Sequence, residues 1–275
     1  MTGLGGIHSI LFVPGSRPDR FGKAVAGGAD LVCIDLEDAV AAEDKGRARS
    51  ATCAALPSLD GARVAVRING LETLDGLRDL VALAEGKCLP TALFIPMANA
   101  PAHVEIVRAA LGPLPLVPLV ETAASLLGAA DIAAAPGVSA MMFGGGDLSA
   151  QLGVELAWEP LMAARGQFIL AGAGRGIGLI DVPFVHLGDE AGLREEARRA
   201  RALGFTAKAA IHPGQVPIIN QVFAPSGDEL AEARASLAAY RAAGGRAVQH
   251  EGRMLEAPLV RRYEALLQQE DRRDA

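Results

Sequence analysis

The sequence of 275 residues has few cysteines, few aromatic side chains and no long apolar run. Its cysteines, Cys33, Cys53 and Cys88, are widely spaced and none belongs to a CxxC pair. This spacing argues against a zinc knuckle, a redox dithiol and a disulfide framework. An odd cysteine count without a framework is typical of a reducing cytoplasm, where we expect the protein to reside.

Other absences exclude further classes of protein. No uninterrupted apolar stretch reaches about eighteen residues, so we expect no transmembrane helix. The start, "MTGLGGIHSILFVPGS", has no cationic lead and only a short apolar run, and we do not expect it to be a signal peptide. The net charge is −6, with no basic patch and no polybasic anchor, so neither nucleic acid nor a membrane is an expected partner.

Apolar residues make up 51% of the chain. Many of them form eight short runs. The runs are continuous rather than alternating, which is typical of strands buried on both faces. They comprise residues 8–13, 30–36, 63–68, 91–96, 115–120, 139–144, 176–181 and 207–212.

Between most of these runs lie Ala-, Leu- and Arg-rich segments with helical spacing. The clearest is 189–204, which is acidic at its start, basic towards its end, and closed by Gly204. Eight strand–helix units predict a (β/α)8 barrel, the TIM-barrel fold, and the chain length suits a single α/β barrel. An open doubly wound sheet would give similar local patterns and remains the alternative.

We assign residues 1–225 to the barrel and residues 226–275 to a C-terminal helical extension or lid. In this extension we expect a helix over 227–245, then a loop, then a final helix. The extension is expected to pack on the barrel or on a neighbouring subunit rather than to form a second catalytic domain.

Polar residues end several of the predicted strands, where the chemistry of such barrels gathers. We therefore expect them to converge on one rim. They are Arg17, Asp35, Glu37, Asp38, Arg67, Asn69, Glu121, Thr122, Asp147, Asp181, Lys208 and His212.

Glu121 and Asp147 follow adjacent predicted strands, so their carboxylates are expected to lie close together. Two such carboxylates repel unless one is protonated or a cation lies between them, and with water and substrate oxygens they suit Mg²⁺. The glycines before Asp147, Gly146 among them, would leave room for a substrate or a hydrated metal. The alternatives are that Asp147 only caps the following helix and that Glu121 is only a helix-start acid.

Arg67 ends an otherwise apolar strand and needs an anionic partner. That partner could be an internal carboxylate such as Glu37, or a substrate carboxylate held by the bidentate fork. Arg17 follows a turn that suits an anion, although it could equally be a surface arginine. Glu37 and Asp38 are expected to orient Arg67 or metal-bound waters.

Two further polar residues are assigned to the fold rather than to chemistry. Asp35 is interpreted as structural. His212, in "IHPGQ", is interpreted as a core or turn histidine rather than a catalytic one.

The motifs "LFVPGSRPDRFGKA", "IDLEDAVAAEDKGRAR", "VRING", "MMFGGGDLSAQLG" and "GRMLEAP" occur in this order along nearly the whole chain. In this respect the sequence resembles the citrate lyase beta-subunit-like branch of the HpcH/HpaI aldolase superfamily. The resemblance implies a TIM barrel that forms a homo-oligomer, a trimer or hexamer. It also implies Mg²⁺ held by Glu121 and Asp147, and a substrate carboxylate or keto-acid end held by Arg67.

The resemblance further implies cleavage or formation of a carbon–carbon bond in a malyl-, citramalyl- or citryl-like thioester of coenzyme A or an acyl carrier protein. Glu256 matches a C-terminal carboxylate that a neighbouring subunit supplies in the coenzyme A lyases and that acts on the thioester enolate. Two departures bear on this role. Met97 stands where the family commonly has lysine, and Glu256 stands where relatives usually carry aspartate, one methylene shorter.

Other functions share these residues. The same site could hydrolyse the thioester or cleave a free acid, and a barrel altered at Met97 and Glu256 could bind a metabolite without turnover. A phosphate- or nucleotide-binding role for "FGGGD" is weak, because the Walker lysine is missing and no GxGxxG follows the first strand.

Overall fold

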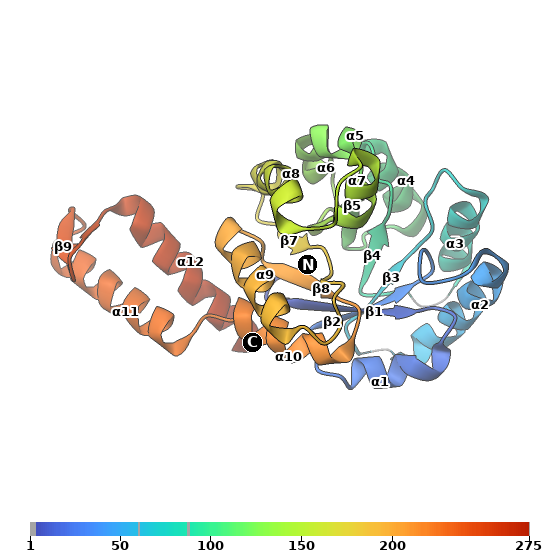
Figure 1. Ribbon diagram of the computed structural model, residues 1–275, viewed down its shortest axis with the longest axis horizontal. Helices are drawn as coiled ribbons and strands as arrows, with labels where there is room; N and C mark the ends of the chain where they lie inside the picture. Colours follow the sequence, from blue (N-terminus) through green and yellow to red (C-terminus); the bar gives the residue numbers. More distant parts are fainter. Residues whose placement is uncertain (1–3, 60, 87–88, 275) are drawn as a thin grey trace. The chain divides into compact units, whose positions relative to one another are not determined.

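The computed structural model describes residues 4–59, 61–86 and 89–274, so Cys88 lies outside the described part of the chain. Eight parallel strands close into a barrel in chain order, because β8 pairs back onto β1 (Figure 1). The barrel prediction is therefore confirmed, and the open sheet is wrong. The strands are β1 Ser9–Pro14, β2 Leu31–Asp35, β3 Val64–Arg67, β4 Ala92–Ile95, β5 Leu116–Val120, β6 Ala140–Phe143, β7 Gly178–Asp181 and β8 Ala207–Ala210.

The strands are mostly apolar because both of their faces are buried. Successive side chains alternate between two apolar clusters. One cluster fills the barrel and draws almost entirely on strand residues, such as Ile10, Cys33 and Leu119. The other lies between the strands and the helices and includes Leu11 and Ile34. This alternation decides which strand-end residues can reach a site at the barrel mouth.

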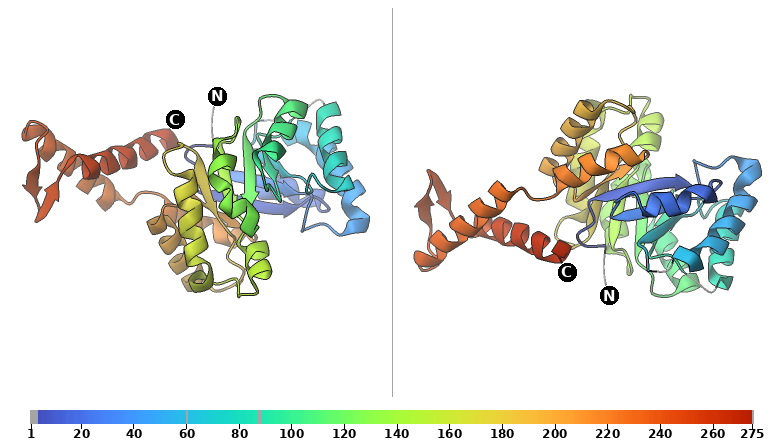
Figure 2. Two further views of the ribbon diagram at one scale, coloured as in Figure 1. Left: turned by 90° about the horizontal axis from the view of Figure 1, so that it is seen from above. Right: turned by 90° about the horizontal axis from the view of Figure 1, so that it is seen from below.

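Helices follow the strands and surround the barrel (Figures 1 and 2). The prediction of a helix over 189–204 is confirmed: Asp189 accepts a hydrogen bond from the Gly192 amide at its start, and Gly204 ends it with a φ of 118°. No described helix combines the length and apolar character needed to cross a bilayer. The helices of this unit are α1 Phe21–Val25, α2 Lys45–Ala55, α3 Leu74–Glu85, α4 Pro101–Leu111, α5 Ala123–Leu127, α6 Ala129–Ala134, α7 Gly145–Leu152, α8 Trp158–Gly172, α9 Glu190–Leu203 and α10 Val216–Phe223. Short 3-10 turns are η1 Pro18–Arg20, η2 Ala42–Asp44, η3 Leu56–Leu59 and η4 Pro213–Gln215.

A buried carboxylate ties α2 to α3 beside the third strand. Asp79 of α3 is fully buried and accepts hydrogen bonds from Arg49 of α2. It also accepts from the backbone and side-chain amides of Asn69, at 2.8 and 2.6 Å. Arg49 reaches Asp75 as well, at 2.8 Å. Asn69 therefore serves the packing of α3 rather than the barrel mouth.

The chain divides into two compact units, one ending at Phe223 and the other beginning at Ala224. In the second unit α11 Gly227–Ala242 and α12 Ala257–Asp274 lie side by side (Figure 2). Ser226 and Glu229 form a capping box at the start of α11. The core of this unit contains Leu237, Leu255 and Tyr263.

The predicted loop between the two helices of this unit is wrong, because it contains an antiparallel hairpin of β9 Val248–His250 and β10 Arg253–Leu255. Glu251 and Gly252 form its tip, both with positive φ, as a two-residue hairpin turn requires. The attachment of this unit to the barrel or to a neighbouring subunit stays a prediction.

Candidate active site

Three charged side chains point into the mouth of the barrel from the ends of strands. They are Asp35 at the end of β2, Arg67 at the end of β3 and Glu121 just after β5. On each strand the residue two places earlier belongs to the interior cluster, so alternation turns all three towards the barrel axis. The carboxyl ends of these strands thus carry charged side chains, at the end of the barrel where this architecture usually places its chemistry.

Arg67 is held by a set of acidic side chains. Its Nε and Nη2 donate to the two carboxylate oxygens of Asp35, at 2.7 and 2.6 Å. Its Nη1 lies 2.8 Å from Glu37 and 3.3 Å from Asp38, and the guanidinium covers the Phe12 ring at 5.3 Å. Burial alone would lower the pKa of Arg67, but these acids raise it above its ordinary value, so the group stays charged.

Asp35 is the principal partner of this arginine. It is 1% exposed and also accepts hydrogen bonds from the amides of Glu37 and Ala39, at 2.9 and 3.1 Å. The internal partner of Arg67 is therefore Asp35 first and Glu37 second, and the structural interpretation of Asp35 is confirmed. Asp35 engages Nε and Nη2 of Arg67, and the remaining Nη1 lies against Glu37 and Asp38.

Glu121 is buried at 2% exposure, and it accepts a hydrogen bond from the backbone amide of Met97. Met97 adopts a φ of 50°, in the left-handed region that non-glycine residues seldom occupy. Burial raises the pKa of Glu121 to about 7, with Asp147 adding to the rise. Burial likewise raises the pKa of Glu37 to about 8.

Asp147 belongs to the first turn of α7 and lies beside the carboxyl group of Glu121. Partial burial and the charge of Asp38 raise the pKa of Asp147. The alternative that Asp147 caps this helix is wrong, because α7 already begins at Gly145 and its N-cap residue is Gly144. The expected proximity of Glu121 and Asp147 is confirmed.

The three glycines before Asp147 have three different surroundings. A Cβ on Gly144 would lie 2.1 Å from the Cβ of Glu121, so the acid occupies the space that a side chain would need. A Cβ on Gly145 would lie 3.1–3.3 Å from three apolar side chains. A Cβ on Gly146 would meet no atom within 4 Å. Only Gly146 thus leaves open space at this turn, beside the carboxyl pair.

Charge is unbalanced around the barrel mouth. Two cations lie here, Arg67 and Lys45, whose ammonium donates to the Leu36 and Glu37 carbonyls. They stand against five carboxyl groups, those of Asp35, Glu37, Asp38, Glu121 and Asp147. Such a group needs either bound protons or an added cation. Across residues 4–59, 61–86 and 89–274, no cluster of three or more His, Cys, Asp or Glu side chains could hold a metal. The adjacent oxygens of Glu121 and Asp147 nevertheless suit Mg²⁺, which keeps several waters and needs few protein ligands.

Besides Asn69, two more residues predicted for this rim do not reach it, and that expectation is wrong for them. Asp181 of β7 and Lys208 of β8 are fully buried and bind each other at 2.6 Å. Asp181 directly follows Ile180, and Lys208 directly precedes Ala209, and both of these neighbours point into the barrel. Because successive side chains on a strand alternate, Asp181 and Lys208 face the helices instead. His212 accepts the Gly214 amide at the start of η4, which confirms a turn role.

Of the remaining predicted residues, Arg17 and Glu256 are exposed and Thr122 is half-buried. Arg17 pairs with Asp19 through two hydrogen bonds, at 2.9 and 2.8 Å, after β1. Glu256 lies between β10 and α12 of the second unit. Thr122 caps α5 in a capping box with Ser125. Roles of Arg17 and Glu256 in binding or proton transfer stay predictions.

Sequence reasoning missed two features of the site. The bidentate hold of Asp35 on Arg67 could have been found from the shared register of the two residues on β2 and β3. The contact of the Met97 amide with Glu121 could not have been found, because no sequence pattern marks a methionine that takes a positive φ.

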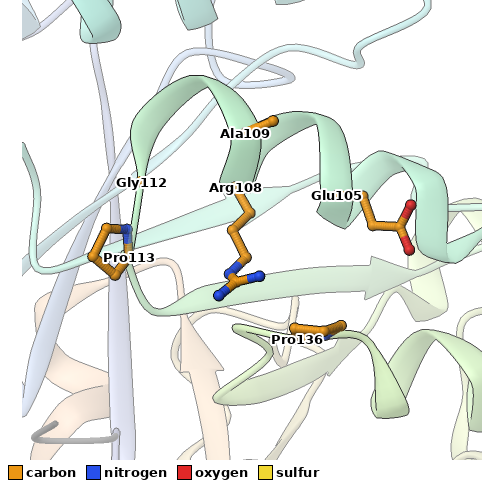
Figure 3. A pocket seen from close by; sticks show the side chains of 6 residues that line it. All are labelled: Glu105, Arg108, Ala109, Gly112, Pro113 and Pro136. Carbon is orange, nitrogen blue, oxygen red and sulfur yellow. The ribbon is translucent and has the colours of Figure 1, made fainter.

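A hollow of about 390 Å³ lies away from these residues (Figure 3). It is lined by the last turns of α4 and by the segments that lead into β5 and β6, with Arg108, Pro113 and Pro136 at its wall. These segments enter the strands at their amino ends, opposite the rim that carries Glu121. Features at that end of a barrel usually serve stability rather than chemistry.

The chain is similar to known proteins over most of its length. The profile of the HpcH/HpaI aldolase/citrate lyase family matches residues 8–213. The chain is 40% identical over 264 residues to a citrate lyase subunit beta-like protein of Mycobacterium tuberculosis, covering 94% of this chain and 93% of that protein.

Relatives with other names are similarly close. A (3S)-malyl-CoA thioesterase of Cereibacter sphaeroides is 39% identical over 240 residues, covering 86% of this chain and 84% of the relative. An L-malyl-CoA/beta-methylmalyl-CoA lyase of the same species is 36% identical over 296 residues, covering 94% and 93%. Among solved structures, CitE of M. tuberculosis in complex with magnesium, acetoacetate and coenzyme A matches with a TM-score of 0.84 and 37% identity, covering 97% of this chain and 98% of that one.

Proposed function

The chain belongs to the HpcH/HpaI aldolase/citrate lyase family, and from this premise we propose that it is a Mg²⁺-dependent carbon–carbon lyase. Its proposed substrate is a 3-hydroxy-acid thioester of the malyl-, citramalyl- or citryl-CoA kind. The observation that carries the proposal is the carboxyl pair of Glu121 and Asp147, set beside Arg67 at the carboxyl ends of the strands. Relatives named as a lyase and a thioesterase both act on malyl-CoA, which supports this class of substrate.

The residues present fit the metal. Glu121 and Asp147 would hold Mg²⁺, since their contact is unfavourable when both are ionised and no cation is near. A bound Mg²⁺ supplies Lewis-acid stabilisation of negative charge on oxygen. Magnesium is present in the complex of the related CitE, which supports the same assignment for this chain.

Arg67 is proposed to hold the carboxylate of the substrate through Nη1, which Glu37 and Asp38 contact in this structure. Asp35 fixes the plane of the guanidinium from the opposite edge, so Arg67 enters the reaction already oriented. Such orientation lowers the entropic part of the barrier. The amide of Met97 keeps one oxygen of Glu121 engaged and leaves the other free for ligation.

In the proposed cleavage, a base removes the proton of the 3-hydroxyl group. The bond between the hydroxyl-bearing carbon and the α-carbon of the thioester then breaks. The electron pair of that bond moves to the thioester fragment as an enolate, and the hydroxyl carbon becomes the carbonyl of a keto acid. Glu256 is proposed to give the enolate its proton, which forms the acyl thioester and leaves the carboxylate to be reprotonated. Arg17 is proposed to contribute a further positive charge for the substrate.

Hydrolysis of the thioester is the second candidate, favoured by the 39% identity to a malyl-CoA thioesterase. In that reaction water attacks the thioester carbonyl, and free coenzyme A leaves with the whole acid intact. The two reactions differ in their products: cleavage gives a keto acid and keeps the thioester bond, whereas hydrolysis gives a free thiol and no keto acid.

The test is turnover of malyl-, citramalyl- and citryl-CoA by purified protein with Mg²⁺, measuring keto acid and free thiol together. Keto acid that disappears with EDTA and in Asp147→Asn, but not in the surface control Asp131→Asn, would support the lyase. Free thiol without keto acid would favour the thioesterase. No product from any thioester, with Mg²⁺ still bound, would turn attention to a free-acid substrate or a metabolite-binding barrel.

A further inference from the structure

A cluster of four charged side chains lies buried behind the rim, between the strands and the helices. Lys208 of β8 donates to Asp181 of β7 at 2.6 Å, to Glu196 of α9 at 2.7 Å and to the backbone carbonyl of Val182 at 2.7 Å. These three acceptors match the three N–H groups of the ammonium. Arg165 of α8 donates to the second oxygen of Asp181, at 2.9 Å. The cluster holds two cations and two carboxylates, so its charges balance.

Arg165 is the member of this cluster that also reaches the sixth strand. Its side chain is 1% exposed, and its guanidinium lies 4.6 Å from the Trp158 ring and 5.3 Å from the Phe143 ring. Its Nη1 is buried without a hydrogen-bond partner. A buried ion pair is poor evidence for stability, because the desolvation cost offsets the attraction. The attraction between the charges therefore does not by itself explain why Arg165 is buried here.

Two residues that the cluster contacts, Phe143 and Val182, lie against the glycine turn. Phe143 is the last residue of β6 and immediately precedes Gly144. A Cβ on Gly145 would lie 3.1 Å from Phe143 and 3.3 Å from Val182, so the first residue of α7 rests on both side chains. Asp147 follows two residues later in the same helical turn. The cluster is therefore linked, through Phe143 and Val182, to the turn that carries Asp147.

We propose that Arg165 is a positioning residue for Asp147, acting through Phe143 and Asp181 and touching neither substrate nor metal. The inference rests on the proposed function, because it assigns Arg165 to the geometry of the Mg²⁺ ligands. Outer partners that orient metal ligands typically alter affinity by about 10- to 100-fold when they are removed. Arg165 should therefore govern Mg²⁺ affinity as well as the stability of the fold.

The chain offers a matched control. Arg199 of α9 also stacks on Trp158 at 4.6 Å, but its partner is Glu159 at 2.9 Å, on the exposed side. The experiment compares Mg²⁺ affinity, by isothermal titration calorimetry, and thermal unfolding in the full-length wild type, Arg165→Met, Arg165→Lys and Arg199→Met. We expect Mg²⁺ binding to weaken about tenfold or more in Arg165→Met. In Arg199→Met it should stay within about twofold of the wild type.

Arg165→Lys keeps a cation for Asp181 but loses the planar stack, so its Mg²⁺ affinity should fall between those of the wild type and Arg165→Met. This variant carries the test if Arg165→Met does not fold. Wild-type affinity in Arg165→Met or Arg165→Lys, whatever the change in melting temperature, would overturn the positioning role alone. A wild type that binds no Mg²⁺ would overturn the proposed metal site and the positioning role with it.

Discussion

Gly144 and Gly146 stand two residues apart, yet they should respond to alanine with opposite signs. Gly144→Ala places a methyl group 2.1 Å from the Cβ of Glu121, and this overpacking should destabilise the fold by about 1–3 kcal/mol. Gly146→Ala meets open space inside α7, and alanine should stabilise the helix there by up to about 1 kcal/mol. Chemical denaturation of the two variants beside the wild type measures both effects. Equal effects in the two variants would contradict this account of the glycine turn.

The buried acids should make stability fall as pH rises in metal-free protein. The pKa of Glu37 is raised to about 8 and that of Glu121 to about 7, whereas the ordinary value of 4.5 applies to both in the unfolded chain. Between about pH 5 and 8 the folded chain therefore binds more protons, and the free energy of unfolding decreases across this range. Denaturation in EDTA at several pH values should show this decrease.

Glu37→Gln provides the control for this pH dependence. The amide does not titrate, so the decrease in unfolding free energy towards pH 8 should become shallower than in the wild type. Identical pH profiles for the two proteins would show that Glu37 takes up no extra proton on folding.

At the scale of elements, the link between α2 and α3 depends on one buried carboxylate. Asp79→Ala removes the partner of both Arg49 and Asn69 and should destabilise the protein by about 3 kcal/mol. Asp75→Ala removes the more exposed partner of the same arginine and should cost at most about 1 kcal/mol. Urea denaturation distinguishes them, and a larger loss in Asp75→Ala would contradict the assignment.

Most elements of the barrel could be predicted because each strand is a short apolar run between helical segments. The predicted run 115–120, for example, corresponds to Leu116–Val120. The face of each strand-end residue was harder to predict, because a shift of one position moves a side chain from the interior to the helices. Asp181 and Lys208 were misplaced for this reason. The β9–β10 hairpin was missed because its strands have three residues each, too few to show a period.

At the scale of the whole molecule, Mg²⁺ should stabilise the folded chain, because the unfolded chain does not bring Glu121 and Asp147 together. At about a hundred times the dissociation constant, the gain is about 2.7 kcal/mol. We therefore expect the melting temperature of the wild type to rise with Mg²⁺ concentration and that of Asp147→Asn to rise much less. Ca²⁺ should raise the melting temperature less than Mg²⁺ does, because its larger coordination number demands more oxygens than two carboxylates supply.

A rise of equal size in wild type and Asp147→Asn would place the stabilising ion elsewhere. Asp131→Asn, which changes one exposed acid on α6, controls for the loss of a negative charge and should respond to Mg²⁺ as the wild type does.

Met97 reaches Glu121 through its backbone, and this has a consequence for how such a site diversifies. A contact made by an amide does not depend on which side chain the residue carries, provided the backbone conformation is kept. The side chain at position 97 can therefore be replaced while Glu121 keeps its hydrogen bond from the backbone amide. The amide contact and the chemistry of the side chain at position 97 can therefore change independently, among side chains that tolerate a positive φ.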